Sequence, residues 1–294
     1  MPSSIEHVSD TAFWVAYYRW VETERKDALF HDPLAKKLAG DRGRALATYM
    51  GTEKAMAWSM ALRTYIIDQY ITDLVEKGVD MVINLGAGLD SRPYRLALPP
   101  HLEWVEVDFK EIIDYKAEIL SKDKPNCHLK RIACDLAVDA DRQTILQALN
   151  GQGKNILVLT EGVVPYLSNE AVTTLAQDLV ELDHVTYWIS DYFSPLFLRI
   201  SARGKIRKRL SKRAPFLFAP GPSSQDWPIF FAKIGWQIKE MRFIGDEGFK
   251  VGRKLPTSWL IGLLMRLASE ARLRPYKQMT GYAVLVKGHE VIEI

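Results

Sequence analysis

The sequence predicts an α/β fold, a doubly wound and mostly parallel sheet of seven strands with an N-terminal layer of helices. Through the middle of the chain, strand-like apolar runs alternate with amphipathic helical segments, which is typical of a parallel sheet covered on both faces. The first run, MVINL, leads into the glycine turn GAGLD and then into a helical segment. Doubly wound proteins bind nucleotide-like ligands at turns of this kind.

Residues 10–78 are predicted to be helical. Apolar residues recur at helical spacing in DTAFWVAYYRWVETERKD, and GTEKAMAWSMALRTYIIDQYITDLVEKG is a long amphipathic pattern that stops at Gly78. Between these two segments, Asp32 is a plausible N-cap for a helix whose first position is Pro33.

Seven strand-like runs follow, with helical patterns such as FKEIIDYKAEILSKD and SNEAVTTLAQDLVELD between the earlier ones. The runs are MVINL (81–85), LEWVEVD (102–108), CHLKRIACDL (127–136), NILVLTEG (155–162), HVTYWISDYF (184–193), GWQIKEMRFIG (235–245) and TGYAVLVKG (280–288). An irregular insert follows the fifth run.

We expect a single domain over residues 1–294. Its expected parts are a helical cap (1–78), a cofactor-binding core (79–193), an insert or lid with a helix (194–234) and closing strands (235–294). With 48% hydrophobic and 26% charged residues, the chain can bury a sizeable core.

Several classes of protein are disfavoured by composition. The net charge of +3 is too mild to argue for a nucleic-acid partner. The apolar stretch SWLIGLLM (258–265) is far shorter than the roughly 20 residues that span a bilayer, and the N-terminus lacks a signal-peptide pattern. We therefore expect a cytoplasmic protein.

Two cysteines, Cys127 and Cys134, lie seven residues apart in a predicted strand. This spacing fits neither a redox pair nor a zinc site, and no metal site is predicted. An odd separation places the two side chains on opposite faces of a strand, and we expect both to be reduced, buried thiols.

The insert carries a basic run. Seven of the eleven residues from Arg203 to Arg213 are Lys or Arg, and none is acidic. The run can be a solvated segment, a lid over the substrate, or a docking patch for an anionic partner. It could also be the footprint of a tRNA-modifying enzyme, but this patch is small for nucleic-acid binding.

The glycine turn excludes two phosphate-binding motifs. A dinucleotide fingerprint needs Gly or Ala where this chain has Ser91, and Asp90 would repel a diphosphate. No GK[ST] sequence follows, which excludes a P-loop. Gly86 and Gly88 together with an acid instead suit an unphosphorylated, cationic amino-acid nucleoside, and S-adenosyl-L-methionine is the common one. Asp90 could also cap a helix that begins in DSRPYRL.

The next three strands end in acids at the edge where such a ligand binds. Asp108 ends the second strand and is well placed to bind both hydroxyls of a ribose. After the third strand, Asp135 can accept a hydrogen bond from the adenine amine and Leu136 can pack on the ring. Glu161 ends the fourth strand, near the reacting end of the cofactor.

The carboxylate of the cofactor needs a cation. Arg63, in the helix before the first strand, is the best-placed candidate, and Arg19 is the second. For each arginine the alternative is an ion pair at the surface or between helices.

Three motifs resemble the leucine carboxyl methyltransferase family, which includes the bacterial polyketide O-methyltransferases of the tetracenomycin type. They are LGAGLDSRPYRL, the upstream DALFHDPLAKKLAG, and TEGVVPYL after the fourth strand. The resemblance covers roughly residues 12–190 and the closing strands. It implies a Rossmann-like class I methyltransferase fold with an added helical layer. A common bacterial signature is LGAGLDTR, and here Ser91 replaces the Thr and keeps the hydroxyl.

The resemblance also implies roles for individual residues. Arg63 would hold the methionine carboxylate and Glu161 the amino group, while Gly86 would approach the methionyl part. Asp108 would bind the ribose, and Asp135 with Leu136 the adenine side. Arg19 corresponds to a basic residue in the first helix of the family.

The acceptor decides whether a general base is needed. A carboxylate is already ionised near neutral pH, whereas a phenol or alcohol benefits from a base. His31, Asp191 and His289 are conceivable bases, as is Tyr166, which could instead orient the acceptor.

Two aromatic or apolar stretches, FSPLF (193–197) and FLFAP (216–220), could line an apolar acceptor pocket. The basic insert would then help to attract an anionic acceptor.

We expect an S-adenosyl-L-methionine-dependent O-methyltransferase that acts on a small-molecule acid or phenol. The alternatives are methylation of a protein's terminal carboxylate and a regulatory protein that binds the cofactor without turnover. A nicotinamide oxidoreductase is least favoured.

Overall fold

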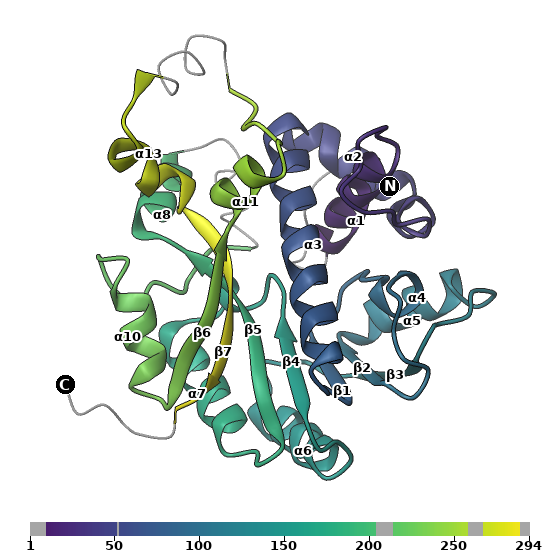
Figure 1. Ribbon diagram of the computed structural model, residues 1–294. Helices are drawn as coiled ribbons and strands as arrows, with labels where there is room; N and C mark the ends of the chain where they lie inside the picture. Colours follow the sequence, from purple (N-terminus) through teal and green to yellow (C-terminus); the bar gives the residue numbers. More distant parts are fainter. Residues whose placement is uncertain (1–9, 52, 204–213, 258–266, 289–294) are drawn as a thin grey trace.

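The strands form one sheet at the centre of the molecule (Figure 1). The computed structural model describes residues 10–51, 53–203, 214–257 and 267–288. The strands are β1 Met81–Leu85, β2 Glu103–Asp108, β3 His128–Ala133, β4 Ile156–Thr160, β5 Val185–Phe193, β6 Trp236–Phe243 and β7 Thr280–Lys287. Each matches one of the seven predicted runs to within a few residues.

The sheet has the order β3-β2-β1-β4-β5-β7-β6. The first five strands are parallel to their neighbours, and β7 runs antiparallel to both β5 and β6. This arrangement confirms the doubly wound, mostly parallel sheet. The direction of winding reverses between β1 and β4, so their carboxyl ends flank the crevice in which such sheets bind ligands.

The central strands are apolar because both faces of the sheet are covered. Every residue of β1 and of β4 is buried. Cys127 packs in the core on one face and Cys134 in the core on the other, as their spacing predicts. Both thiols are free, and burial raises the pKa of Cys127 to about 12.

Helices cover the sheet in two layers (Figure 1). They are α1 Asp10–Thr23, α2 Ala35–Met50, α3 Glu53–Glu76, α4 Arg92–Arg95, α5 Lys110–Ile119, α6 Asp139–Asn150, the 3-10 turn η1 Val164–Tyr166, α7 Asn169–Val180, α8 Pro195–Arg203, α10 Asp226–Ala232, α11 Ile244–Lys250 and α13 Glu270–Lys277. The α3 helix packs on one face, and α6, α7 and α10 pack on the other.

The N-terminal layer consists of α1, α2 and α3, as predicted. The α1 and α2 helices share a third apolar cluster that reaches Leu89 of the glycine turn. The predicted helix start at Pro33 with Asp32 as its cap is wrong, because the helix begins at Ala35 after Leu34. Asp32 Oδ1 still accepts a hydrogen bond from Leu34 N at 3.2 Å, and its Oδ2 forms a buried ion pair with Arg19.

Three sequence features lie outside the described residues: the basic run after Arg203, the apolar stretch 258–265, and His289. Among the helices that the structure does describe, none has the length and apolar character required to cross a bilayer.

Candidate functional site

The glycine turn after β1 depends on left-handed backbone. Gly86 has φ 70° and Gly88 has φ 50°, values that residues with a side chain rarely adopt. The N–H groups of Gly86 and Ala87 donate to the carbonyl of Val107 at the end of β2, at 2.8 and 3.2 Å. A Cβ atom on Gly86 would also collide with Val163 Cγ2. The turn therefore holds two peptide groups close to the crevice, where no side chain fits.

Asp108 joins the tip of β2 to this turn. Its Oδ2 accepts a hydrogen bond from Gly88 N at 2.6 Å, and its Oδ1 accepts one from Phe109 N at 2.7 Å. Since α5 begins at Lys110 with Phe109 as its capping residue, Asp108 is not the helix cap. A carboxylate oxygen can accept more than one hydrogen bond, and a sugar hydroxyl is a suitable donor.

Glu161, directly after β4, sits between two arginines. Its Oε1 accepts a hydrogen bond from Arg63 Nε of α3 at 2.5 Å, and its Oε2 accepts one from Arg92 Nη1 of α4 at 2.6 Å. Burial by itself would raise the pKa of Glu161, but the charges of the two arginines lower it below its usual range. The structure thus brings the predicted cation Arg63 and the predicted acid Glu161 into one partly buried ion pair.

Asp90 lies beneath the turn and is buried. Its Oδ2 accepts hydrogen bonds from Asn84 Nδ2 and Arg92 Nη1, both at 3.0 Å, and its Oδ1 accepts one from Arg92 N. Although burial opposes ionisation, Arg92 lowers the pKa of this carboxyl well below its usual range. Asp90 therefore holds the first residue of α4 through its side chain, although the capping residue of this helix is Ser91 and not Asp90.

The sequence analysis did not identify Arg92, or Asp68, which is a further acidic partner of Arg92. Arg92 Nε donates to Asp68 Oδ1 at 2.7 Å, and Arg95 donates to both oxygens of the same acid, also at 2.7 Å. All three side chains are nearly inaccessible to solvent. The available signal was an acid within the apolar run TYIIDQYITDLV, because a charge on a buried helix face needs a partner.

Arg19 is engaged on the far side of the turn. Its Nε donates to Asp32 Oδ2 at 2.8 Å, and its Nη2 donates to the carbonyl of Leu89 at 2.5 Å. The hydroxyl of Ser91 donates to the same Asp32 oxygen at 2.6 Å. Arg19 thus joins α1 to the glycine turn, and the hydroxyl at position 91 has a buried structural partner.

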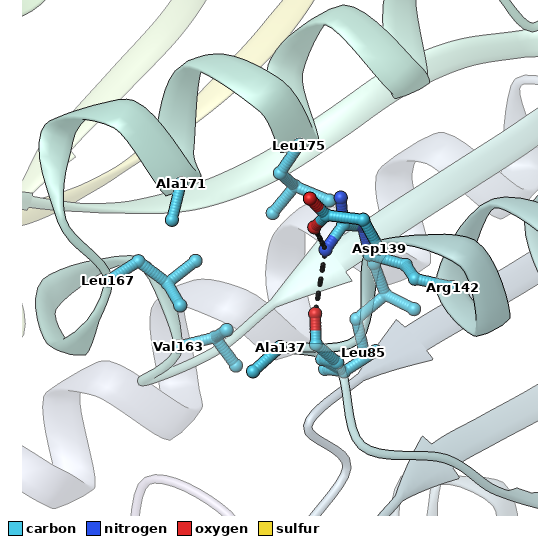
Figure 2. A pocket seen from close by; sticks show the side chains of 9 residues that line it. Leu85, Ala137, Asp139, Arg142, Val163, Leu167, Ala171 and Leu175 are labelled. Atoms are coloured by element: carbon cyan, nitrogen blue, oxygen red, sulfur yellow. Dashed lines mark hydrogen bonds and ion pairs between the residues drawn. The ribbon is translucent and has the colours of Figure 1, made fainter.

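A cavity of about 100 Å³ lies between the ends of β1, β3 and β4 and the helices α6 and α7 (Figure 2). It is lined by Leu85, Leu136, Ala137, Asp139, Arg142, Val163, Leu167, Ala171 and Leu175. Arg142 Nη1 donates to the carbonyl of Leu136 at 2.7 Å and thereby fixes the loop after β3.

Of the two residues predicted to contact adenine, Leu136 and Asp135, only Leu136 lines this cavity. Asp135 is exposed, and its Oδ1 accepts a hydrogen bond from Ala137 N at 2.9 Å.

The carboxyl end of β5 contributes a buried acid. Asp191 Oδ2 accepts a hydrogen bond from Gly162 N at 2.8 Å, while Oδ1 has no hydrogen-bond partner among the described residues. Burial raises the pKa of Asp191 to about 6, against the opposing effect of Arg63. Of the other conceivable bases with described positions, His31 is exposed, and burial raises the pKa of Tyr166 to about 12.

Aromatic side chains gather next to this acid. The ring of Phe193 stacks on those of Phe197 and Phe216, with centroids 4.8 and 5.3 Å apart. Tyr166 of η1 lies 5.3 Å from Phe216. These four residues, which we call the aromatic cluster, are each half-buried. They unite the two stretches that the sequence suggests for an acceptor pocket.

No set of three or more His, Cys, Asp or Glu side chains within the described part of the chain is arranged to hold a metal ion. The site is thus built from a glycine turn, strand-end acids, buried arginines and aromatic rings.

Residues 12–180, more than half of the chain, match the leucine carboxyl methyltransferase family. The chain belongs to the leucine carboxyl methyltransferase family.

Relatives similar over most of their length support this assignment. A protein of Streptomyces coelicolor, provisionally named an S-adenosyl-L-methionine-dependent methyltransferase, is 34% identical over 267 residues, which are 84% of this chain and 89% of the relative. A protein of Mycobacterium tuberculosis with the same provisional name is 32% identical over 273 residues, or 85% of this chain and 86% of the relative. This leucine carboxyl methyltransferase family member is accordingly an S-adenosyl-L-methionine-dependent methyltransferase.

Solved structures show the same fold. A provisionally named methyltransferase from Thermobifida fusca superposes with a TM-score of 0.58 at 14% identity, over 97% of this chain and 96% of its own. A DUF574 family protein from Streptomyces avermitilis has a TM-score of 0.57 at 14% identity, over 94% and 97%. At this identity the two structures bear on the fold alone. They confirm the class I methyltransferase-like architecture with added N-terminal helices.

Proposed function

We propose that this protein transfers the methyl group of S-adenosyl-L-methionine to an oxygen atom of a small-molecule acceptor, a carboxylic acid or a phenol. The observation that carries the proposal is the partly buried Arg63–Glu161 ion pair at the carboxyl end of β4. An amino acid is a zwitterion, and this pair offers each of its charged groups an opposite charge in one place. Gly162, with φ 72°, lets the chain pass directly against the Arg63 guanidinium.

The proposed cofactor contacts follow the crevice. Arg63 binds the methionine carboxylate and Glu161 the ammonium group, beside the half-buried peptides of Gly86 and Gly88. Asp108, held in place by two backbone N–H groups, accepts the ribose hydroxyls. Arg19 and Asp90 position the turn from behind and make no direct contact in this proposal.

The adenine ring belongs in the cavity lined by Leu136, with Asp135 beside its outer edge. The volume of about 100 Å³ is smaller than the roughly 150 Å³ cavity that takes up benzene. The cavity therefore opens when the ring enters, by movement of lining side chains such as Leu167. The apolar walls of the cavity suit the adenine ring, the charges of Arg63 and Glu161 suit the methionyl group, and Asp108 suits the ribose.

When bound, the cofactor supplies an electrophilic methyl group, and the protein orients the acceptor and excludes water. An acceptor with an oxygen nucleophile fits the end of the crevice near β5, where the Asp191 carboxylate and the Tyr166 phenol lie. Tyr166 is proposed to orient the acceptor, since η1 begins three residues after Glu161 and the Tyr166 ring joins the aromatic cluster.

Calorimetric titration with S-adenosyl-L-methionine and S-adenosylhomocysteine tests the cofactor site. The wild-type protein should bind both, and Asp108→Ala should weaken binding at least tenfold because two hydroxyl contacts to a charged acceptor are lost. Asp114→Ala, which removes an exposed acid of α5, is the matched control and should bind normally. A folded wild-type protein that binds neither compound would refute the proposal, and equal affinities for Asp108→Ala and wild type would refute the site.

A further inference from the structure

The proposed cofactor contacts leave one buried carboxylate oxygen unused. Asp191 is 3% exposed, and within the part of the chain that the structure describes its Oδ1 has no hydrogen-bond partner, although Oδ2 is held by Gly162 N at 2.8 Å. A buried polar atom without a partner is costly, and folded proteins keep few of them. Because Gly162 follows Glu161, this oxygen lies beside the proposed methionyl end of the crevice.

The aromatic cluster continues from the same face of β5. Side chains alternate along a strand, so Asp191 and Phe193 point to the same face of the sheet. Phe193 stacks against Phe197 and Phe216, and Phe216 contacts Tyr166. The rings are half-buried, so they present apolar surface next to the unpaired oxygen. This combination of an apolar aromatic wall with one hydrogen-bond acceptor suits an aromatic ring that carries a hydroxyl group.

We propose that the acceptor is a phenol bound against the aromatic cluster and that Asp191 accepts its proton, a role that rests on the proposed function. The charges around Asp191 favour a neutral hydroxyl over a carboxylate. Arg63 faces Asp191 but already donates to Glu161, while Tyr166 and Tyr282 add no positive charge. A carboxylate acceptor would meet the negative charge of Asp191, whereas a hydroxyl donates to it.

The reaction balances with these groups. The phenol oxygen attacks the methyl carbon, a C–O bond forms, and the C–S bond breaks with its electron pair left on sulfur. The hydroxyl proton passes to Asp191 Oδ1 and then to solvent after the products leave. The products are the methyl ether, S-adenosylhomocysteine and one proton.

Burial sets the pH range in which Asp191 can act. It raises the pKa of this carboxyl to about 6, while Arg63 and the Gly162 N–H act in the opposite sense. Asp191 is therefore ionised, and able to accept a proton, above about pH 6. Turnover of a phenol should rise as the pH increases through this value.

A matched pair of probes, 2-naphthol and 2-naphthoate, separates the two acceptor classes on the same ring system. Binding is measured by fluorescence titration to the protein loaded with S-adenosylhomocysteine, at pH 5 and pH 8. We expect 2-naphthol to bind about tenfold more tightly at pH 8, because a hydrogen bond to a charged acceptor is stronger. The affinity for 2-naphthoate should fall at pH 8.

Asp191→Asn keeps the shape of the side chain and should remove both pH effects on binding. With S-adenosyl-L-methionine and 2-naphthol, it should lower kcat about 100-fold or more, the range for loss of a general base. Its affinity for S-adenosylhomocysteine should stay within about threefold of wild type. A tenfold loss of that affinity, or wild-type kcat in Asp191→Asn, would overturn the role of Asp191.

Phe216→Ala tests the aromatic wall, with Phe249→Ala, an exposed ring on α11, as the matched control. Phe216→Ala should weaken both probes and Phe249→Ala neither. Binding of neither probe to the loaded wild type, or a preference for 2-naphthoate at pH 8, would overturn the phenol assignment. Wild-type protein that fails to bind S-adenosylhomocysteine would reject the proposed function itself, which distinguishes the two failures.

Discussion

At the scale of single residues, the charges of the site are held mostly by one another. Glu161 accepts hydrogen bonds from Arg63 and Arg92. Arg63 belongs to α3, which precedes β1 in the sequence, and Arg92 belongs to α4, which follows it. Arg92 in turn reaches Asp68 and Asp90. Removing one acid from such a buried set leaves cations without partners, so its effect exceeds the loss of one contact.

We predict that Glu161→Gln destabilises the fold and weakens the cofactor together. The buried Arg92 and the partly buried Arg63 would lose their shared carboxylate, which costs on the order of 3 kcal/mol of unfolding free energy. Urea unfolding measures the first effect, and calorimetry with S-adenosyl-L-methionine measures the second. Glu170→Gln, in the exposed first turn of α7, is the control and should change neither quantity. A variant as stable as wild type would contradict the importance of this pair.

Asp191 leads to the opposite prediction, a gain in stability on substitution. Its folded pKa of about 6 lies above the usual value of 3.8, so its contribution to stability is full below about pH 4 and is lost as the pH rises through 6. Asp191→Asn should therefore stabilise the protein at pH 7.5, by roughly 3 kcal/mol at 1.36 kcal/mol per pKa unit. At pH 4 the variant and wild type should be alike.

Urea unfolding at the two pH values measures this difference. Asp114→Asn, which changes an exposed acid, should match wild type at both. If Asp191→Asn is destabilised equally at pH 4 and pH 7.5, the carboxyl is not held in an unfavourable buried state. A stabilising change at a residue needed for turnover would be an instance of the trade-off between stability and activity.

At the scale of elements, the glycine turn is the part that several segments hold in place. It hydrogen-bonds to the end of β2, contacts Val163 after β4, and lies against Ala12 of α1. A side chain in the turn would thus meet two separate obstacles, the left-handed backbone and the neighbouring Val163.

Gly86→Ala should cost more than backbone strain alone. Gly252 offers a matched control, since its φ is 72° against 70° for Gly86, yet nothing lies within 4 Å of its added Cβ. We expect Gly252→Ala to cost about 1 kcal/mol of unfolding free energy and Gly86→Ala clearly more, with loss of cofactor binding. Chemical unfolding and calorimetry on both variants check this. Equal costs would mean that Val163 moves away freely.

At the scale of the whole molecule, the sheet order assembles the site. Because β1 lies between β2 and β4, the glycine turn, Asp108 and Glu161 all meet at one edge of the sheet. The next strand, β5, brings Asp191 to the same edge. The helices α3 and α4 then supply Arg63 and Arg92 from outside the sheet. Two relatives and two solved structures match the chain over most of its length, so this assembly belongs to the family fold.

The sequence by itself determined the seven strands, the helical layer, the family and the cofactor. These follow from local patterns, because strand periodicity and a glycine turn at a strand end have few structural solutions. Sequence placed Asp108 and Glu161 correctly at strand ends, since parallel strands share one carboxyl edge. It also placed Cys127 and Cys134 on opposite faces by simple alternation.

Only the tertiary structure decided how the charges pair and which groups remain available. It pairs Arg19 with Asp32 and Asp90 with Arg92, and it leaves one oxygen of Asp191 without a partner among the residues with described positions. It also joined Tyr166 to a ring fifty residues further along the chain. The physical reason is that burial and ion pairing depend on contacts between distant segments, which no local spacing of residues encodes.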